Sequence, residues 1–362
     1  MNAPIAIAAI LATVGILLGG SVILTRFTSR VGIPIALGFI AVGMLAGSEG
    51  LGHIRFDDYT FAFRAGVVAL VLILFDGGLN TPPAALRPVA APSLTLATLG
   101  VVVTAVIVGA FAHFAGGLAW PIGLLIGSVV SSTDAAAVFA TLRGSGISLK
   151  PRVGRILEAE SGLNDPVAII LTISLTTIVL NRELSGGEGV WLLPALAALE
   201  IAIGGAMGWL AGTLSGKLLT RVRLESAGLY PVLTLAIALS VFGVTTLIHG
   251  SGFMAVYVAG VVLAGADQLP HRPAILRVHD AFGWLAQIGM FLVLGLLAFP
   301  TRLAAATLPG KDVTAIEYLD ARGADGRYRK YRAMFIQGKC YPLHLAISND
   351  WKVHYYTAAM SD

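Results

Sequence analysis

The sequence predicts an all-α polytopic membrane protein, and three observations support that fold class. Hydrophobic residues make up 56% of the 362 residues and charged residues only 12%, against roughly 25% charged residues in soluble domains. The run Ala3–Leu24 has no charged residue and is long enough to cross the roughly 30 Å hydrocarbon core of a bilayer. Similar apolar stretches recur as far as Pro300. A soluble fold could not bury so much apolar surface, so we expect the lipid bilayer around these stretches.

Ten apolar stretches are predicted to be membrane spans. The first has no basic leading segment and no cleavage site of small residues, so we expect a retained span rather than a signal peptide. Short polar breaks separate the stretches. The predicted spans are 3–24, 33–47, 61–79, 94–115, 119–141, 154–180, 191–214, 228–248, 251–266 and 281–299.

Basic residues are concentrated in every second loop between the predicted spans. The loops after the first, third, fifth, seventh and ninth spans hold twelve Lys and Arg residues, whereas the other loops hold only Arg55 and Arg182. Basic residues collect in cytoplasmic loops. We therefore expect a multi-pass protein with its N-terminus outside.

The sequence changes character after Pro300. The charge up to that residue is 15 Lys and Arg against 14 Asp and Glu, and the remainder holds 9 against 6. Arg332–Ile336 and Cys340–Ile347 alternate in strand fashion on either side of Gly338, which predicts a hairpin. This small basic excess does not indicate nucleic-acid binding.

We divide the chain accordingly into a transmembrane domain, residues 1–303, and a short tail, residues 304–362, of α+β or β-hairpin structure. Cys340 is the only cysteine, so the sequence predicts neither an intrachain disulfide nor a cysteine metal cluster.

The fifth predicted span contains the polar run Ser131-Ser132-Thr133-Asp134 in an otherwise apolar helix. An acidic side chain in a span costs roughly 2.5–3.5 kcal/mol on insertion scales, so its presence needs a reason. Hydroxyl groups can satisfy backbone carbonyls that are freed where a membrane helix unwinds. The run therefore predicts a break in this helix, with Asp134 at the break.

The sixth predicted span carries five further polar residues: Glu158, Glu160, Ser161, Asn164 and Asp165. Ser161 and Asp165 are four residues apart and share a helix face, with Glu158 one turn earlier. Glu160 and Asn164 form a neighbouring stripe. Oxygen ligands of this type suit a hard monovalent cation rather than a soft metal.

These carboxylates predict that a proton and a cation compete for the same oxygen atoms. A carboxylate in a low-dielectric cavity takes up a proton readily near neutral pH, and a cation that binds the same oxygens expels that proton. Our hypothesis is that Asp165 is the shared proton and cation site and that Asp134 supports it. Asp76 either is solvated at its helix end or lines an ion funnel together with Glu158. We expect Glu160 to form one half of a structural ion pair.

Three segments carry a family resemblance: Leu74-Phe75-Asp76-Gly77-Gly78-Leu79, Ser132–Val138 and Glu158–Pro166. Over residues 1–303 the chain resembles bacterial monovalent cation/proton antiporters, the sodium- or potassium-proton branch of the sodium/proton exchanger family. The resemblance implies a helical bundle of two inverted repeats and a homodimer. It also implies exchange of K⁺ or Na⁺ for H⁺ across the inner membrane, without a cofactor.

The resemblance also assigns roles to individual residues. Thr133 and Asp134 match the family's unwound site, and Ser161 and Asp165 match its ion ligands. Asn164 matches the neighbour associated with electroneutral exchange. Glu160 matches an acid that pairs with an arginine on a later helix.

The chain departs from the family pattern after the tenth span, where three more helices are expected. Without them the inverted repeat is incomplete, and the segments Ile316–Gly323, Arg329–Arg332 and Tyr341–Ile347 instead resemble a fragment of an ATP-grasp-type domain. Three hypotheses follow: an antiporter, a non-transporting truncated or chimeric product of an antiporter and an ATP-grasp-type protein, and a membrane-anchored ligase or kinase. The last fails because the tail has no glycine-rich phosphate loop, so no enzyme is expected.

Overall fold

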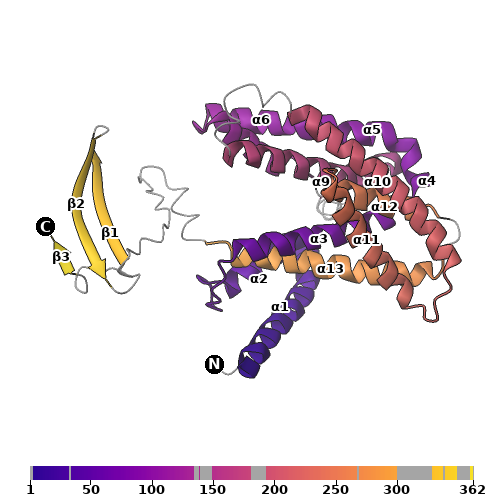
Figure 1. Cartoon of the computed structure of the whole chain (residues 1–362), viewed down its shortest axis with the longest axis horizontal. Helices are drawn as coiled ribbons and strands as arrows, with labels where there is room; N and C mark the ends of the chain where they lie inside the picture. Colours follow the sequence, from indigo (N-terminus) through magenta and orange to yellow (C-terminus); the bar gives the residue numbers. More distant parts are fainter. Residues whose placement is uncertain are drawn as a thin grey trace. The chain divides into compact units, whose positions relative to one another are not determined.

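The computed structural model describes residues 3–31, 34–133, 138, 149–180, 193–266, 269–299, 328–336, 339–348 and 359–361. The chain divides into two units, Met1–Pro300 and Thr301–Asp362. The described part of the first unit is mainly helical, and the named elements of the second are strands, as Figure 1 shows.

Each of the ten predicted spans overlaps a described helix of the first unit, which confirms the predicted all-α membrane fold. The segments from α4 to α6 form one continuous run, Pro83–Phe114. The elements are α1 (Ala3–Val31), α2 (Ile35–Ala46), α3 (Tyr59–Leu79), α4 (Pro83–Leu86), η1 (Arg87–Val89), α5 (Ala90–Thr95), η2 (Leu96–Gly100), α6 (Val101–Phe114), α7 (Trp120–Val129), α9 (Pro151–Leu180), α10 (Leu193–Arg221), α11 (Leu229–Leu247), α12 (Gly252–Ala264) and α13 (Arg272–Leu296).

Three of these helices are shorter than predicted. Among the described residues, seven helices are long and apolar enough to cross a membrane, whereas α2, α7 and α12 are short apolar helices. They contain 12, 10 and 13 residues, and at about 1.5 Å per residue none reaches across the roughly 30 Å core. Helix α7 ends where polar residues begin, and α12 is enclosed by other helices.

Helix α12 lies at the centre of the packing, against α3, α10 and α11. Glycines allow the close approach: a Cβ built on Gly78 of α3 would lie 3.0 Å from the Cα of Gly260 in α12, and one on Gly208 of α10 would lie 2.8 Å from the Cβ of Val258. Small residues at such contacts let membrane helices pack closely. The side chain of Ser251 caps α12 by accepting a hydrogen bond from the Met254 amide, as expected at a helix N-terminus.

The outward faces of α1 and α6 expose large apolar side chains. Leu11 of α1 is 66% exposed and Phe111 of α6 is 72% exposed, and Ile10, Ile16 and Ile107 are exposed beside them. In water so many exposed apolar side chains would be unfavourable. The bilayer explains them, because lipid tails are as apolar as the side chains.

The second unit contains a three-stranded antiparallel sheet in the order β1 (Tyr328–Ile336), β2 (Lys339–Ser348) and β3 (Ala359–Ser361). The register of β1 with β2 shifts between Arg332 and Ala333, which marks a bulge. The first two strands include the residues of the predicted hairpin.

Candidate ion site

Helix α7 ends just before a segment that is neither helix nor strand. It stops at Val129, and residues 131–133 have no regular secondary structure. The Ser131 hydroxyl donates to the Ser128 carbonyl at 2.7 Å, which satisfies a carbonyl at the helix end. The Ser128 hydroxyl lies 3.0 Å from that of Thr172 in α9. The described part of the segment therefore shows the predicted break, and its start is tied to α9.

Helix α9 supplies the other half of the site. Its 30 residues include Pro166, which has no backbone N–H, so the carbonyl of Gly162 lacks its usual helical donor. The polar residues of the predicted site lie just before this proline: Glu160, Ser161, Asn164 and Asp165.

Ser132 connects the break to the carboxylate of Asp165. Its hydroxyl donates a hydrogen bond to Oδ1 of Asp165, and Oδ1 of Asn164 lies 3.2 Å from the same hydroxyl oxygen. A serine hydroxyl has one proton. The proton therefore serves one of these two acceptors at a time.

Thr133 is held by three residues of α9. Its hydroxyl lies 3.0 and 3.1 Å from the carboxylate oxygens of Glu160, and its carbonyl accepts from the Ser161 hydroxyl at 2.8 Å. The side-chain amide of Asn164 donates to the Thr133 hydroxyl and to Oε1 of Glu160, each at 2.8 Å. Asn164 is fully buried. These hydrogen bonds form one network, which therefore fixes the non-helical backbone against α9; its members are Ser132, Thr133, Glu160, Ser161, Asn164 and Asp165.

The network gathers oxygen atoms of the kind that bind hard cations. The Thr133 carbonyl, the Ser161 hydroxyl and the Asp165 carboxylate come together around the end of α7. Asp134, the other predicted ion ligand, lies outside the described residues. Its role beside Thr133 stays a prediction.

Two predicted residues, Glu158 and Asp76, lie outside this network, whereas Glu160 belongs to it. Glu158 is exposed and makes no hydrogen bond to the network within the described part of the chain. Glu160 bonds to Thr133 and Asn164, and its pairing with an arginine stays a prediction. Asp76 of α3 accepts a hydrogen bond from the Asn80 side chain at 3.1 Å.

Asp76 faces α13 rather than the network. A Cβ built on Gly283 of α13 would lie 3.1 Å from Oδ2 of Asp76, and the carboxylate of Asp280 is close enough to repel that of Asp76. Sequence reasoning missed Asp280 because it precedes the predicted span 281–299. The two carboxyl groups thus lie near each other between α3 and α13, and a role of Asp76 in an ion funnel stays a prediction.

Sequence reasoning also gave Ser132 no role of its own. The polar run contained it, but sequence alone cannot tell which of three adjacent hydroxyl residues contacts the carboxylate. Only the contact with Asp165 identifies Ser132 as the bridging residue.

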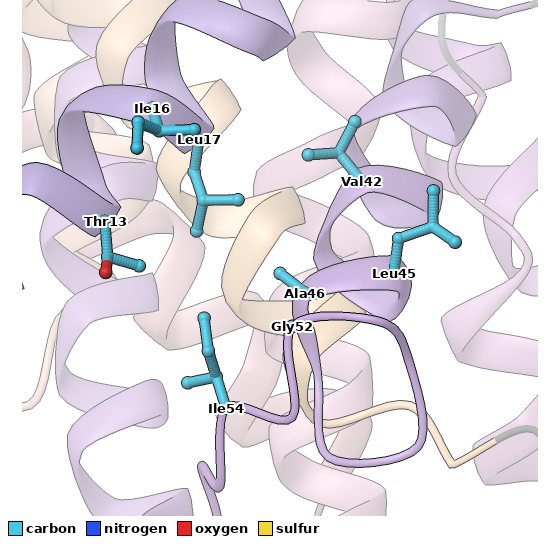
Figure 2. Close-up of a pocket in the computed structure, with 8 residues that line it drawn as sticks. All are labelled: Thr13, Ile16, Leu17, Val42, Leu45, Ala46, Gly52 and Ile54. Atoms are coloured by element: carbon cyan, nitrogen blue, oxygen red, sulfur yellow. The ribbon is translucent and has the colours of Figure 1, made fainter.

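A separate apolar pocket of about 390 Å³ lies between α1, α2 and the loop after α2. Figure 2 shows Ile16 and Leu17 of α1 across from Val42 and Leu45 of α2. Of its eight lining residues, only Thr13 has a polar side chain. The pocket offers no charged ligand and is not the ion site.

Known proteins resemble this chain in sequence and in fold. The chain is 44% identical over 309 residues to the K(+)/H(+) antiporter NhaP of Alkalimonas amylolytica, covering 85% of this chain and 53% of the relative. It is 44% identical over 292 residues to the K(+)/H(+) antiporter NhaP2 of Shewanella oneidensis, covering 80% and 50%. The chain thus spans about half the length of these curated relatives.

A solved structure shares the fold. The sodium proton antiporter MjNhaP1 from Methanocaldococcus jannaschii superposes with a TM-score of 0.67 at 22% sequence identity, over 82% of this chain and 72% of that chain. Residues 9–313 match the family described as sodium/hydrogen exchanger, transmembrane. The chain therefore belongs to the sodium/hydrogen exchanger family.

Proposed function

We propose that the chain is a secondary active antiporter that exchanges K⁺ or Na⁺ for H⁺, with Asp165 as the shared site and Asp134 as its support. The observation that carries the proposal is the Ser132–Asp165 hydrogen bond across the break after α7. It brings a membrane carboxylate to a non-helical backbone segment that also offers a carbonyl oxygen and hydroxyl groups.

The exchange follows from competition for the same oxygens. With the proton on Asp165, the carboxyl group is neutral and cannot hold a cation. A cation coordinated by Asp165, Ser161 and the Thr133 carbonyl expels the proton, and access from the opposite side reverses the step. Neither ATP nor a cofactor is needed, and the function is transport rather than enzyme catalysis.

Potassium is the first cation to test. The relatives at 44% identity are named K(+)/H(+) antiporters, whereas the sodium proton antiporter MjNhaP1 is only 22% identical. The oxygen ligands themselves suit either monovalent cation.

The proposal also covers the orientation of the chain, the membrane that holds it and its oligomeric state. The distribution of Lys and Arg supports an N-terminus outside, and the resemblance supports a bacterial inner membrane and a homodimer. Accessibility of a cysteine placed in the first loop tests the orientation, and the mass of the purified complex tests the homodimer.

Everted vesicles that contain the chain and a pH-sensitive dye test the proposed exchange. Addition of K⁺ or Na⁺ should release protons from acidified vesicles, and Asp165→Asn should abolish the release. Glu225→Gln is the control, because this exposed acid lies between α10 and α11, outside the network. A wild-type chain that inserts but moves no protons with either cation would instead support the non-transporting alternative.

A further inference from the structure

Tyr257 lies in the centre of the bundle, on α12, against the helix that carries Asp165. Its side chain is 2% exposed, and a Cβ built on Gly162 of α9 would lie 2.7 Å from its hydroxyl oxygen. Gly162 precedes Asp165 by three residues, less than one helical turn. The Tyr257 hydroxyl is close enough to Asp165 for the two groups to interact electrostatically.

The Tyr257 hydroxyl has no hydrogen-bond partner within the part of the chain that the structure describes. Thr81 is near it, but the two hydroxyls do not meet hydrogen-bond geometry, and that of Thr81 donates to the Gly77 carbonyl at 2.7 Å. Buried polar groups are rarely left without a partner. A phenol kept unpaired in the apolar centre therefore suggests a partner that is engaged in another state of the site.

Asp165 is the acidic neighbour that can take this role. The single Ser132 proton has two acceptors, Asp165 and Asn164. When it turns to Asn164, the Asp165 carboxylate loses that donor. Tyr257 then offers an O–H from α12 in its place.

We propose that Tyr257 is a positioning residue of the ion site, whose O–H donates a hydrogen bond to the ionised carboxylate of Asp165 when Ser132 turns away. The inference rests on the proposed function of Asp165. A hydrogen bond to the charged form favours that form. Tyr257 thus holds the carboxylate in a position to bind the cation when the Ser132 hydroxyl is turned away.

Tyr257→Phe tests the inference, because it removes the hydroxyl and keeps the ring. The readout is the thermal stabilisation of the purified full chain by K⁺ and by Na⁺, titrated at a series of pH values. We expect the half-saturating cation concentration to rise roughly tenfold. A hydroxyl with a packing role alone would change the melting temperature and leave this concentration unchanged.

Tyr230→Phe is the matched control. Tyr230 is also buried, at 5% exposure, and its hydroxyl donates to the Val222 carbonyl at 3.1 Å, a contact outside the network. Its loss should lower the melting temperature and leave the cation titration unchanged. Gly162→Ala provides a second route, since the new methyl group displaces the Tyr257 hydroxyl and should shift the titration in the same direction as Tyr257→Phe.

The outcomes separate the inference from the proposed function. If the wild-type chain binds cations, and Tyr257→Phe and Gly162→Ala both keep its half-saturating cation concentration at every pH, Tyr257 is only a packing residue. The inference is then overturned. A lower melting temperature without a shifted titration has the same meaning, since it fits a side chain that contributes only to packing. A wild-type chain that no cation stabilises overturns both the inference and the proposed function.

Discussion

The hydroxyl of Ser132, in the non-helical segment after α7, donates a hydrogen bond to the carboxylate of Asp165 in α9. The next residue, Thr133, is held by Glu160, Ser161 and Asn164 of the same helix. The break in α7 is therefore not a free loop. Side chains of a neighbouring helix hold it beside the carboxylate of Asp165.

Ser132→Ala should weaken cation binding, because Asp165 loses its hydroxyl donor. A hydrogen bond to a charged group contributes about 1.5–3 kcal/mol, which corresponds to roughly a ten- to hundredfold rise in the apparent KM for the cation. Dye-loaded vesicles with increasing K⁺ measure this. Ser131→Ala is the control, since Ser131 donates only to the Ser128 carbonyl within the described residues, and equal effects of the two changes would contradict the assignment.

Asn164→Ala should destabilise the bundle and abolish exchange. Asn164 is fully buried and joins Thr133 to Glu160, so its loss leaves buried polar groups unpaired at a cost of about 1–3 kcal/mol. Thermal unfolding in detergent measures the loss. Asn80→Ala, at an exposed asparagine that bonds to Asp76, should change the melting temperature much less.

Gly78→Ala should destabilise the contact between α3 and α12. The added methyl group would lie 3.0 Å from the Cα of Gly260, and such overpacking costs about 1–3 kcal/mol. Gly66→Ala on the same helix is the matched control, because nothing lies within 4 Å of its added Cβ. That change should be neutral or slightly stabilising, by up to about 1 kcal/mol. Similar melting temperatures for both variants would refute the close contact.

Asp76→Asn should raise the apparent KM for the cation and spare the maximal rate, if Asp76 attracts cations rather than binds them in the exchange step. The effect should be larger at low salt, because screening weakens long-range attraction. Initial rates of exchange at two ionic strengths measure it. Asp280→Asn should act in the same direction, since the Asp280 carboxylate is close enough to repel that of Asp76. A lost maximal rate in Asp76→Asn would place Asp76 within the ion site itself.

Much of the helical unit could be predicted, because apolar runs of sufficient length have few alternatives to a membrane helix. Residues 3–24 and 154–180 fall within α1 and α9. The lengths of α2 and α12 could not be predicted in the same way. Apolar residues look alike whether they face lipid or other helices, and only packing shows that α12 is enclosed.

The sequence by itself determined the membrane class, the family and most of the candidate site residues, since acidic side chains inside apolar spans are costly and occur mainly where they serve a function. Tertiary structure alone decided that Ser132 reaches Asp165, that Asn164 locks Thr133 to Glu160, and that Asp76 faces α13 instead. The reason is geometric. Hydrogen bonds between α9 and the break after α7 depend on how two helices distant in sequence are placed, and that placement depends on packing against their neighbours.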